Sequence, residues 1–180
     1  MTATIDDRPE PDLDLPPDDT ATIRRVVLFA IVIATLLLVR TLVLEPVRVR
    51  SDSMAPALSS GAMLIIDKVT YRTRDPHRGE IVVTSDPRNG GSIIKRIVAV
   101  GGDSVGIEDG QLVVNGKPVL EPDIDNENMD GYYFGPDAVP LGSVFLLGDN
   151  RDTSEDSRAF GPVDVDDIDG RVLLKVWPLG

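Results

Sequence analysis

The hydrophobic pattern of the chain contains one long apolar run, residues 26–44, interrupted by Thr35, Arg40 and Thr41. As a helix this run would span about 28 Å, close to the roughly 30 Å hydrocarbon core of a bilayer. A buried helix of a soluble protein is the alternative, but such a helix is rarely apolar on nearly every side. We therefore predict a transmembrane signal anchor over residues 23–45.

Residues 1–22 are acidic and rich in proline, a composition that predicts a disordered tail. A cleavable signal peptide normally begins with its positive charges, and a small-x-small cleavage site follows its apolar run; neither holds here. The anchor is therefore predicted to remain uncleaved. Arginines flank it on both sides, so charge alone leaves its orientation open.

Beyond the anchor, short β-branched and apolar stretches alternate with Gly, Pro and Asn turns, and no sustained helical period appears. We predict an antiparallel, mainly β domain over residues 46–180, with strands at 63–67, 80–84, 93–100, 112–114, 144–147 and 171–176. Asn115-Gly116 predicts a hairpin with a type I′ turn. Residues 121–142 are polar and interrupted by Pro and Gly, so a loop or small subdomain is expected there.

Composition removes several kinds of chemistry. The net charge of -12 argues against nucleic acid as a partner, and the absence of cysteine excludes disulfides and thiolate nucleophiles. The single histidine, His77, lies in a polar turn, which gives a Ser-His-Asp triad little support and excludes a multi-histidine zinc site. The acidic segment 164–170 has Ile168 where a calcium loop needs a carboxylate. No cofactor or metal is expected.

Two positions together suggest a nucleophile and its base. Ser53, in the segment Ser51-Asp52-Ser53-Met54 just after the anchor, could equally be a turn residue. Lys95 shares a strand face with isoleucines. A free lysine has a pKa near ~10.4, but burial can lower this value until the amine serves as a base for a serine hydroxyl. A lysine on an exposed edge strand is the alternative.

A third segment, residues 148–158, reads Gly-Asp-Asn-Arg-Asp-Thr-Ser-Glu-Asp-Ser-Arg and follows an apolar strand. Its dense Asp, Ser and Arg residues could satisfy the backbone of their own loop. They could also hold the lysine in place.

Four blocks, residues 51–58, 78–83, 94–103 and 148–158, follow the apolar run in this order. In sequence and order they resemble bacterial type I signal peptidase (leader peptidase), the membrane-anchored Ser-Lys dyad family. The resemblance implies a coiled antiparallel β-sheet catalytic domain with one N-terminal transmembrane helix. It also implies a cytoplasmic N-terminus and an extracytoplasmic catalytic domain that lies on the membrane surface.

The same resemblance assigns roles to residues. Ser53 would be the nucleophile and Lys95 the general base, with the Ser51 hydroxyl and the Ser53 N–H in the oxyanion hole. Ser154 would orient the lysine; the residues implied to brace the site are Asp149, Asp156 and Arg158. The implied substrates are preproteins, cut after small residues at the first and third positions before the bond. The resemblance also implies that the protein is embedded in a lipid bilayer. Whether it contacts the secretion translocon is left open.

Three residues depart from the family pattern: Arg50 replaces a frequent proline, Asp52 a frequent glycine and Ala57 a frequent threonine. Asp52 could change the field beside Ser53 or pair with Arg50. Two other functions stay open, a self-cleaving Ser-Lys protease of the repressor type and a non-catalytic anchored β module that binds a partner.

Overall fold

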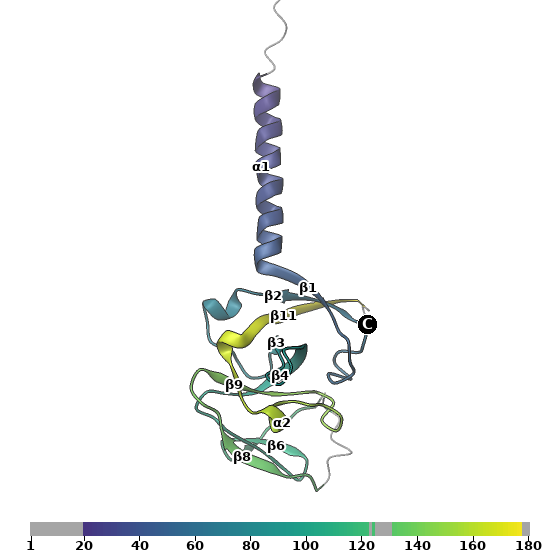
Figure 1. Cartoon of the computed structure of the whole chain (residues 1–180), viewed down its shortest axis with the longest axis vertical. Coiled ribbons are helices and arrows are strands. Elements are labelled where there is room, and N and C mark those ends of the chain that lie inside the picture. Colours follow the sequence, from purple (N-terminus) through teal and green to yellow (C-terminus); the bar gives the residue numbers. More distant parts are fainter. Residues whose placement is uncertain (1–19, 123, 125–130, 178–180) are drawn as a thin grey trace, which may run out of the picture. The chain divides into compact units, whose positions relative to one another are not determined.

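The structure, a computed structural model, describes residues 20–122, 124 and 131–177. Residues 1–19, most of the predicted tail, lie outside this part. Helix α1, Thr20–Val43, begins three residues before the predicted anchor and ends two residues before its predicted end (Figure 1). Its residues 20–40 are exposed on every side, and they are long and apolar enough to cross a membrane. The Thr35 hydroxyl donates to the Ile31 carbonyl, 2.9 Å away, so this polar group is satisfied within the helix.

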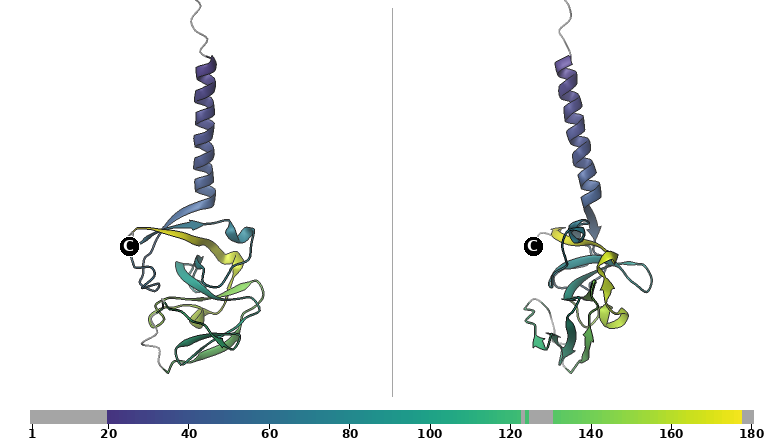
Figure 2. Two further views of the ribbon diagram at one scale, coloured as in Figure 1. Left: turned by 180° about the vertical axis from the view of Figure 1, so that it is seen from behind. Right: turned by 90° about the vertical axis from the view of Figure 1, so that its left-hand side faces the viewer.

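The β domain contains two antiparallel sheets (Figures 1 and 2). The larger has the order β1 (Leu44–Arg48), β2 (Met63–Asp67), β11 (Ile168–Trp177), β3 (Ile81–Ser85), β4 (Ser92–Val100), β9 (Ser143–Leu147) and β10 (Val163–Asp164). The smaller has the order β7 (Lys117–Pro118), β6 (Gln111–Val114), β5 (Ser104–Glu108) and β8 (Phe134–Ala138). Short helices are η1 (Thr70–Arg72), α2 (Ser157–Phe160) and η2 (Val165–Asp167). The prediction of a mainly β, antiparallel fold with one N-terminal apolar helix is confirmed.

The six predicted strands correspond to β2, β3, β4, β6, β9 and β11. Asn115 and Gly116 have φ values of 54° and 69°, as a type I′ turn requires, and Val114 pairs with Lys117 across it. Within residues 121–142, where a loop or small subdomain is expected, β8 forms a strand of the smaller sheet. This strand contains Gly135 and Pro136, which the sequence pattern favours in turns. Residues 123 and 125–130 of that segment lie outside the described part.

The buried core comprises three apolar clusters. One joins the two sheets and includes Val98, Val105, Leu112 and Phe145. A second lies on the larger sheet around Val82, Ile97 and Leu146, and the third, around Met54, is described below. The pairing of β4 with β9 shifts register between Ile97 and Ala99, so three successive residues of β4 are buried there. This irregularity ties the strand that carries Lys95 into two clusters at once.

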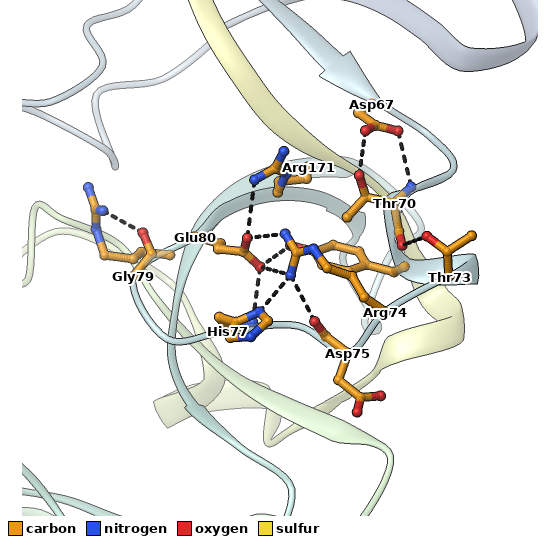
Figure 3. Close-up of polar contacts among 11 residues, drawn as sticks. Asp67, Thr70, Thr73, Arg74, Asp75, His77, Gly79, Glu80 and Arg171 are labelled. Atoms are coloured by element: carbon orange, nitrogen blue, oxygen red, sulfur yellow. Dashed lines mark hydrogen bonds and ion pairs between the residues drawn. The ribbon is translucent and has the colours of Figure 1, made fainter.

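A separate polar cluster surrounds Glu80 (Figure 3). Its carboxylate accepts hydrogen bonds from the Tyr71 hydroxyl and the His77 backbone N–H, both at 2.9 Å, and from Arg74 and Arg171. The exposed His77 ring accepts from Arg74 through Nδ1 at 2.6 Å. The only histidine of the sequence therefore belongs to a structural ion cluster.

Candidate active site

The loop that carries Ser53 is fixed by the residue that follows it. Met54 is fully buried in a cluster with Val49, Leu58 and Leu64, and its carbonyl accepts from the Leu58 N–H at 2.8 Å. Burying one methionine side chain stabilises a structure by about 1.5–3 kcal/mol. Because the buried Met54 side chain anchors the turn in the core, the neighbouring Ser53 is held at the surface, where it remains partly exposed.

Within this loop, Ser51 and Ser53 lie side by side, with 3.2 Å between their Oγ atoms. The Asp52 carboxylate accepts from the backbone N–H of Ser60 at 2.9 Å and closes the loop on itself. Among the described residues Asp52 makes no ion pair with Arg50. The residue in the frequent glycine position therefore has a structural partner eight positions along the chain.

Lys95 lies on β4, opposite the fully buried Val82 of β3, and only 3% of its surface is exposed. Burial lowers the pKa of its ammonium group; the nearby Asp156 carboxylate opposes this shift and the Arg158 guanidinium adds to it. Its Nζ donates to Ser154 Oγ at 3.0 Å. The alternative of an exposed edge-strand lysine is wrong, because β4 has a partner strand on each side.

The loop after β9 is held by two buried ion pairs. Asp149 is fully buried and receives two hydrogen bonds from Arg96, at 2.7 and 2.6 Å. Asp156 is also fully buried, and Arg158 donates to it through Nε at 2.8 Å. Arg158 also donates to the carbonyl of Ser154. These contacts fix the backbone that presents the Ser154 hydroxyl to Lys95.

Two residues in this loop connect it directly to the serine loop. A Cβ on Gly148 would lie 2.6 Å from the Ser53 carbonyl oxygen and would overlap the Ser154 side chain. The next contact is a hydrogen bond of 3.1 Å from the Asn150 N–H to the same carbonyl. The sequence showed Gly148 and Asn150 only as members of a block rich in Asp, Ser and Arg. It therefore did not predict that either residue contacts the loop that carries Ser53.

Ser51, Ser53 and Lys95 share a cleft of about 640 Å³ in the β domain. Asp149, Asp156 and Arg158 do not line it, and their contacts hold the loop after β9 instead. Within the described part of the chain, no direct hydrogen bond joins Lys95 to Ser53, and no cluster of His, Asp and Glu could hold a metal ion. The cleft also has charged walls, formed by residues such as Arg48, Asp86 and Glu155, that sequence reasoning did not find.

Comparison with known proteins gives consistent matches. The model of the family "Signal peptidase, peptidase S26" matches residues 22–177. Signal peptidase I of Leptolyngbya laminosa is 34% identical over 149 residues, 78% of this chain and 72% of that protein. Signal peptidase I U of Bacillus subtilis is 35% identical over 164 residues, 86% of this chain and 88% of that protein. A solved signal peptidase I from Enterococcus faecalis has 31% identity and a TM-score of 0.49, covering 56% of this chain and 98% of that one. Since the family model spans most of its length, this chain belongs to the signal peptidase family, peptidase S26.

Proposed function

We propose that this protein is a membrane-anchored serine endopeptidase that removes N-terminal signal peptides from exported preproteins, with Ser53 as nucleophile and Lys95 as general base. One observation carries the assignment of the dyad. The buried Lys95, whose pKa is lowered, shares a cleft with a serine that a buried methionine anchors. A serine hydroxyl needs an adjacent base to attack a peptide carbonyl, and a neutral amine meets that need.

In the first step, neutral Lys95 accepts the Ser53 proton as Oγ attacks the scissile carbonyl carbon. The carbonyl oxygen becomes an oxyanion, for which the Ser51 hydroxyl and the Ser53 N–H are the proposed donors. In the described part of the chain, the Ser53 N–H donates to no other group. Each such donor typically stabilises the transition state by about 3–4 kcal/mol. The Lys95 ammonium then protonates the leaving amine, and an acyl-enzyme remains on Ser53.

In the second step, Lys95 takes a proton from water as the water oxygen attacks the ester carbon. The bond from this carbon to Ser53 Oγ then breaks, Lys95 returns the proton to Oγ, and the signal peptide leaves with a free carboxylate. Ser154 accepts one Nζ hydrogen at 3.0 Å. This contact limits rotation of the amine, so its lone pair can stay directed toward the cleft. Ser154 is thus proposed as a positioning residue rather than a catalytic one.

The cleft suits an extended peptide. It runs beside β1, which has β2 as its single partner strand in the described sheet, so its other edge can accept backbone hydrogen bonds. Preference for small residues before the scissile bond is part of this proposal, through the family resemblance.

We further propose that residues 23–45 span the membrane, with residues 1–22 in the cytoplasm and the β domain over residues 46–180 outside it. Part of the domain surface supports contact with lipid. On β11, Leu173, Leu174, Val176 and Trp177 are exposed apolar residues, and Met63 pairs with Trp177. A preprotein would reach the cleft as it leaves the secretion translocon.

The test is cleavage of a purified preprotein in detergent by the wild type, Ser53→Ala and Lys95→Ala. We expect the wild type to release the signal peptide, and both variants to lose activity while keeping the circular dichroism spectrum of the wild type. Normal processing by Lys95→Ala would refute the dyad. A folded wild type that cleaves no preprotein would favour the non-catalytic binding module instead.

A further inference from the structure

The charges that line the cleft are not balanced evenly. Asp86 receives two hydrogen bonds from the guanidinium of Arg88, at 3.1 and 2.8 Å, and Arg88 also donates to Glu155 at 2.8 Å. Glu45, at the beginning of β1, pairs with Lys68 at 3.0 Å. Each acidic side chain of the lining therefore already has a basic partner.

Two arginines that also line the cleft have no such partner among the described residues. Arg48 ends β1 and Arg50 lies two residues further, just before Ser51. Both are exposed, both line the cleft, and neither makes an ion pair with any described residue. The buried Val49 between them fixes the backbone, with its N–H donating to the Ala62 carbonyl at 2.8 Å. Along residues 48–50 the side chains are exposed, buried and exposed in turn, and both arginines line the same cleft, so the two guanidinium groups can act on the same ligand.

This arrangement is unusual in a chain with 30 acidic and 18 basic residues. Nearby carboxylates have not neutralised the pair, although acidic residues are abundant. A guanidinium has a planar set of donors that suits a carboxylate. A free basic pair beside the proposed nucleophile thus points to a negative charge on the molecule that enters the cleft.

We infer that Arg48 and Arg50 form a carboxylate-recognising subsite, so that the enzyme prefers preproteins with an Asp or Glu close to the cleavage site. This inference rests on the proposed function, because it concerns the peptide that Ser53 would cleave. Arg88 does not contribute to the subsite, since its positive charge is already paired with the carboxylates of Asp86 and Glu155.

The experiment uses the full-length protein in detergent and a family of peptides with one common cleavage site. A single Glu, Gln or Lys is placed at each position from five before to five after the bond. At one position or two neighbouring ones, we expect Glu to give a kcat/KM about two- to fivefold above Gln, the range for an exposed ion pair. Lys at the same position should lower kcat/KM below the value for Gln. Added salt should reduce both the gain from Glu and the loss from Lys.

Variants then test whether Arg48 and Arg50 cause the preference for Glu. Arg48→Gln and Arg50→Gln should each weaken it and the double variant should abolish it, while the kcat/KM for the neutral peptide stays within about twofold of the wild type. Arg72→Gln is the matched control, since it removes one exposed arginine of η1 outside the cleft and should keep the preference.

Two results would overturn the inference while leaving the peptidase function intact. One is cleavage of the neutral peptide with no position that favours Glu, and the other is a preference that survives in the double variant. A third result would reassign the pair: loss of binding to phosphatidylglycerol vesicles in the double variant, with unchanged peptide preference, would mean that the arginines contact lipid headgroups.

Discussion

Lys95 Nζ lies 3.0 Å from Ser154 Oγ, although the two residues are 59 positions apart in the chain. The hydroxyl of Ser154 accepts this hydrogen bond from a lysine side chain that is almost fully buried. Arg158 holds the Ser154 backbone, and the buried Asp156 holds Arg158. The position of the lysine amine therefore depends on a loop whose fixing residues, Asp156 and Arg158, do not themselves line the cleft.

Replacing Ser154 with Ala should lower kcat about 10- to 100-fold with little change in KM, the range expected when a hydrogen bond to an ionisable group is lost. A hydrogen bond accepted from the ammonium form favours that form, so its loss should also move the acidic limb of the pH–rate profile to lower pH. Ser154→Thr keeps the hydroxyl and should restore much of the rate. A lower kcat with an unmoved acidic limb would show that Ser154 supports only the loop.

Gly148→Ala should abolish most activity, because the added Cβ would overlap the Ser154 side chain and lie 2.6 Å from the Ser53 carbonyl oxygen. A shift of about 1 Å in either loop can reduce the rate by about 100-fold. Gly91→Ala is the control, since its Cβ would meet only the end of the flexible Asn89 side chain. Comparable losses of activity in the two variants would contradict the close approach of the two loops.

Local patterns explain how much of this fold could be predicted from the sequence. Ser53 and Lys95 stood out because one follows an apolar run and the other interrupts an apolar strand. The hairpin at Asn115 also has a local cause, the positive φ values of its turn. Strands β5 and β8 were missed because they contain glycine or proline. Position 106 of β5 favours glycine because there is little room for a side chain: a Cβ would lie 3.0 Å from the Phe134 carbonyl oxygen.

The remaining features of the site depend on contacts between distant segments. The Asn150 side chain reaches the Asp52 carbonyl at 3.4 Å across 98 positions, and Arg88 reaches Glu155 across 67. No local pattern of polar residues specifies such partners. For the same reason, the sequence could not distinguish Arg88, which pairs with Asp86 and Glu155, from Arg50, which pairs with none of the residues that the structure describes.

Lys95→Met should give an inactive protein that is more stable than the wild type. The folded-state pKa of Lys95 lies below its unfolded value, so burying the charged form costs stability at every pH below about 10.4. We expect Tm at pH 7 to rise by about 2–6 °C, and this gain should shrink as the pH approaches 10.4. Thermal unfolding followed by circular dichroism of the β-sheet band measures both the gain in Tm at pH 7 and its decrease at higher pH. Lys117→Met, a change of an exposed lysine on β7, should give no such gain. A destabilised Lys95→Met protein at pH 7 would contradict the lowered pKa.

Glu80→Gln should remove a source of acid sensitivity that lies outside the cleft. Although burial opposes ionisation of Glu80, hydrogen bonds from Arg74, His77 and Tyr71 hold its pKa at about 2, below the usual 4.5. Its contribution to stability is therefore present above about pH 4.5 and is lost as the pH falls toward 2. Urea unfolding at pH 7 should show a loss of about 1–3 kcal/mol in Glu80→Gln, and the difference from the wild type should narrow as the pH approaches 2. Glu108→Gln, at the exposed end of β5, should follow the wild type at every pH. If Glu80→Gln instead stayed equally far below the wild type from pH 7 to pH 2, the cluster around Glu80 would owe its stability to packing rather than to the ionised carboxylate.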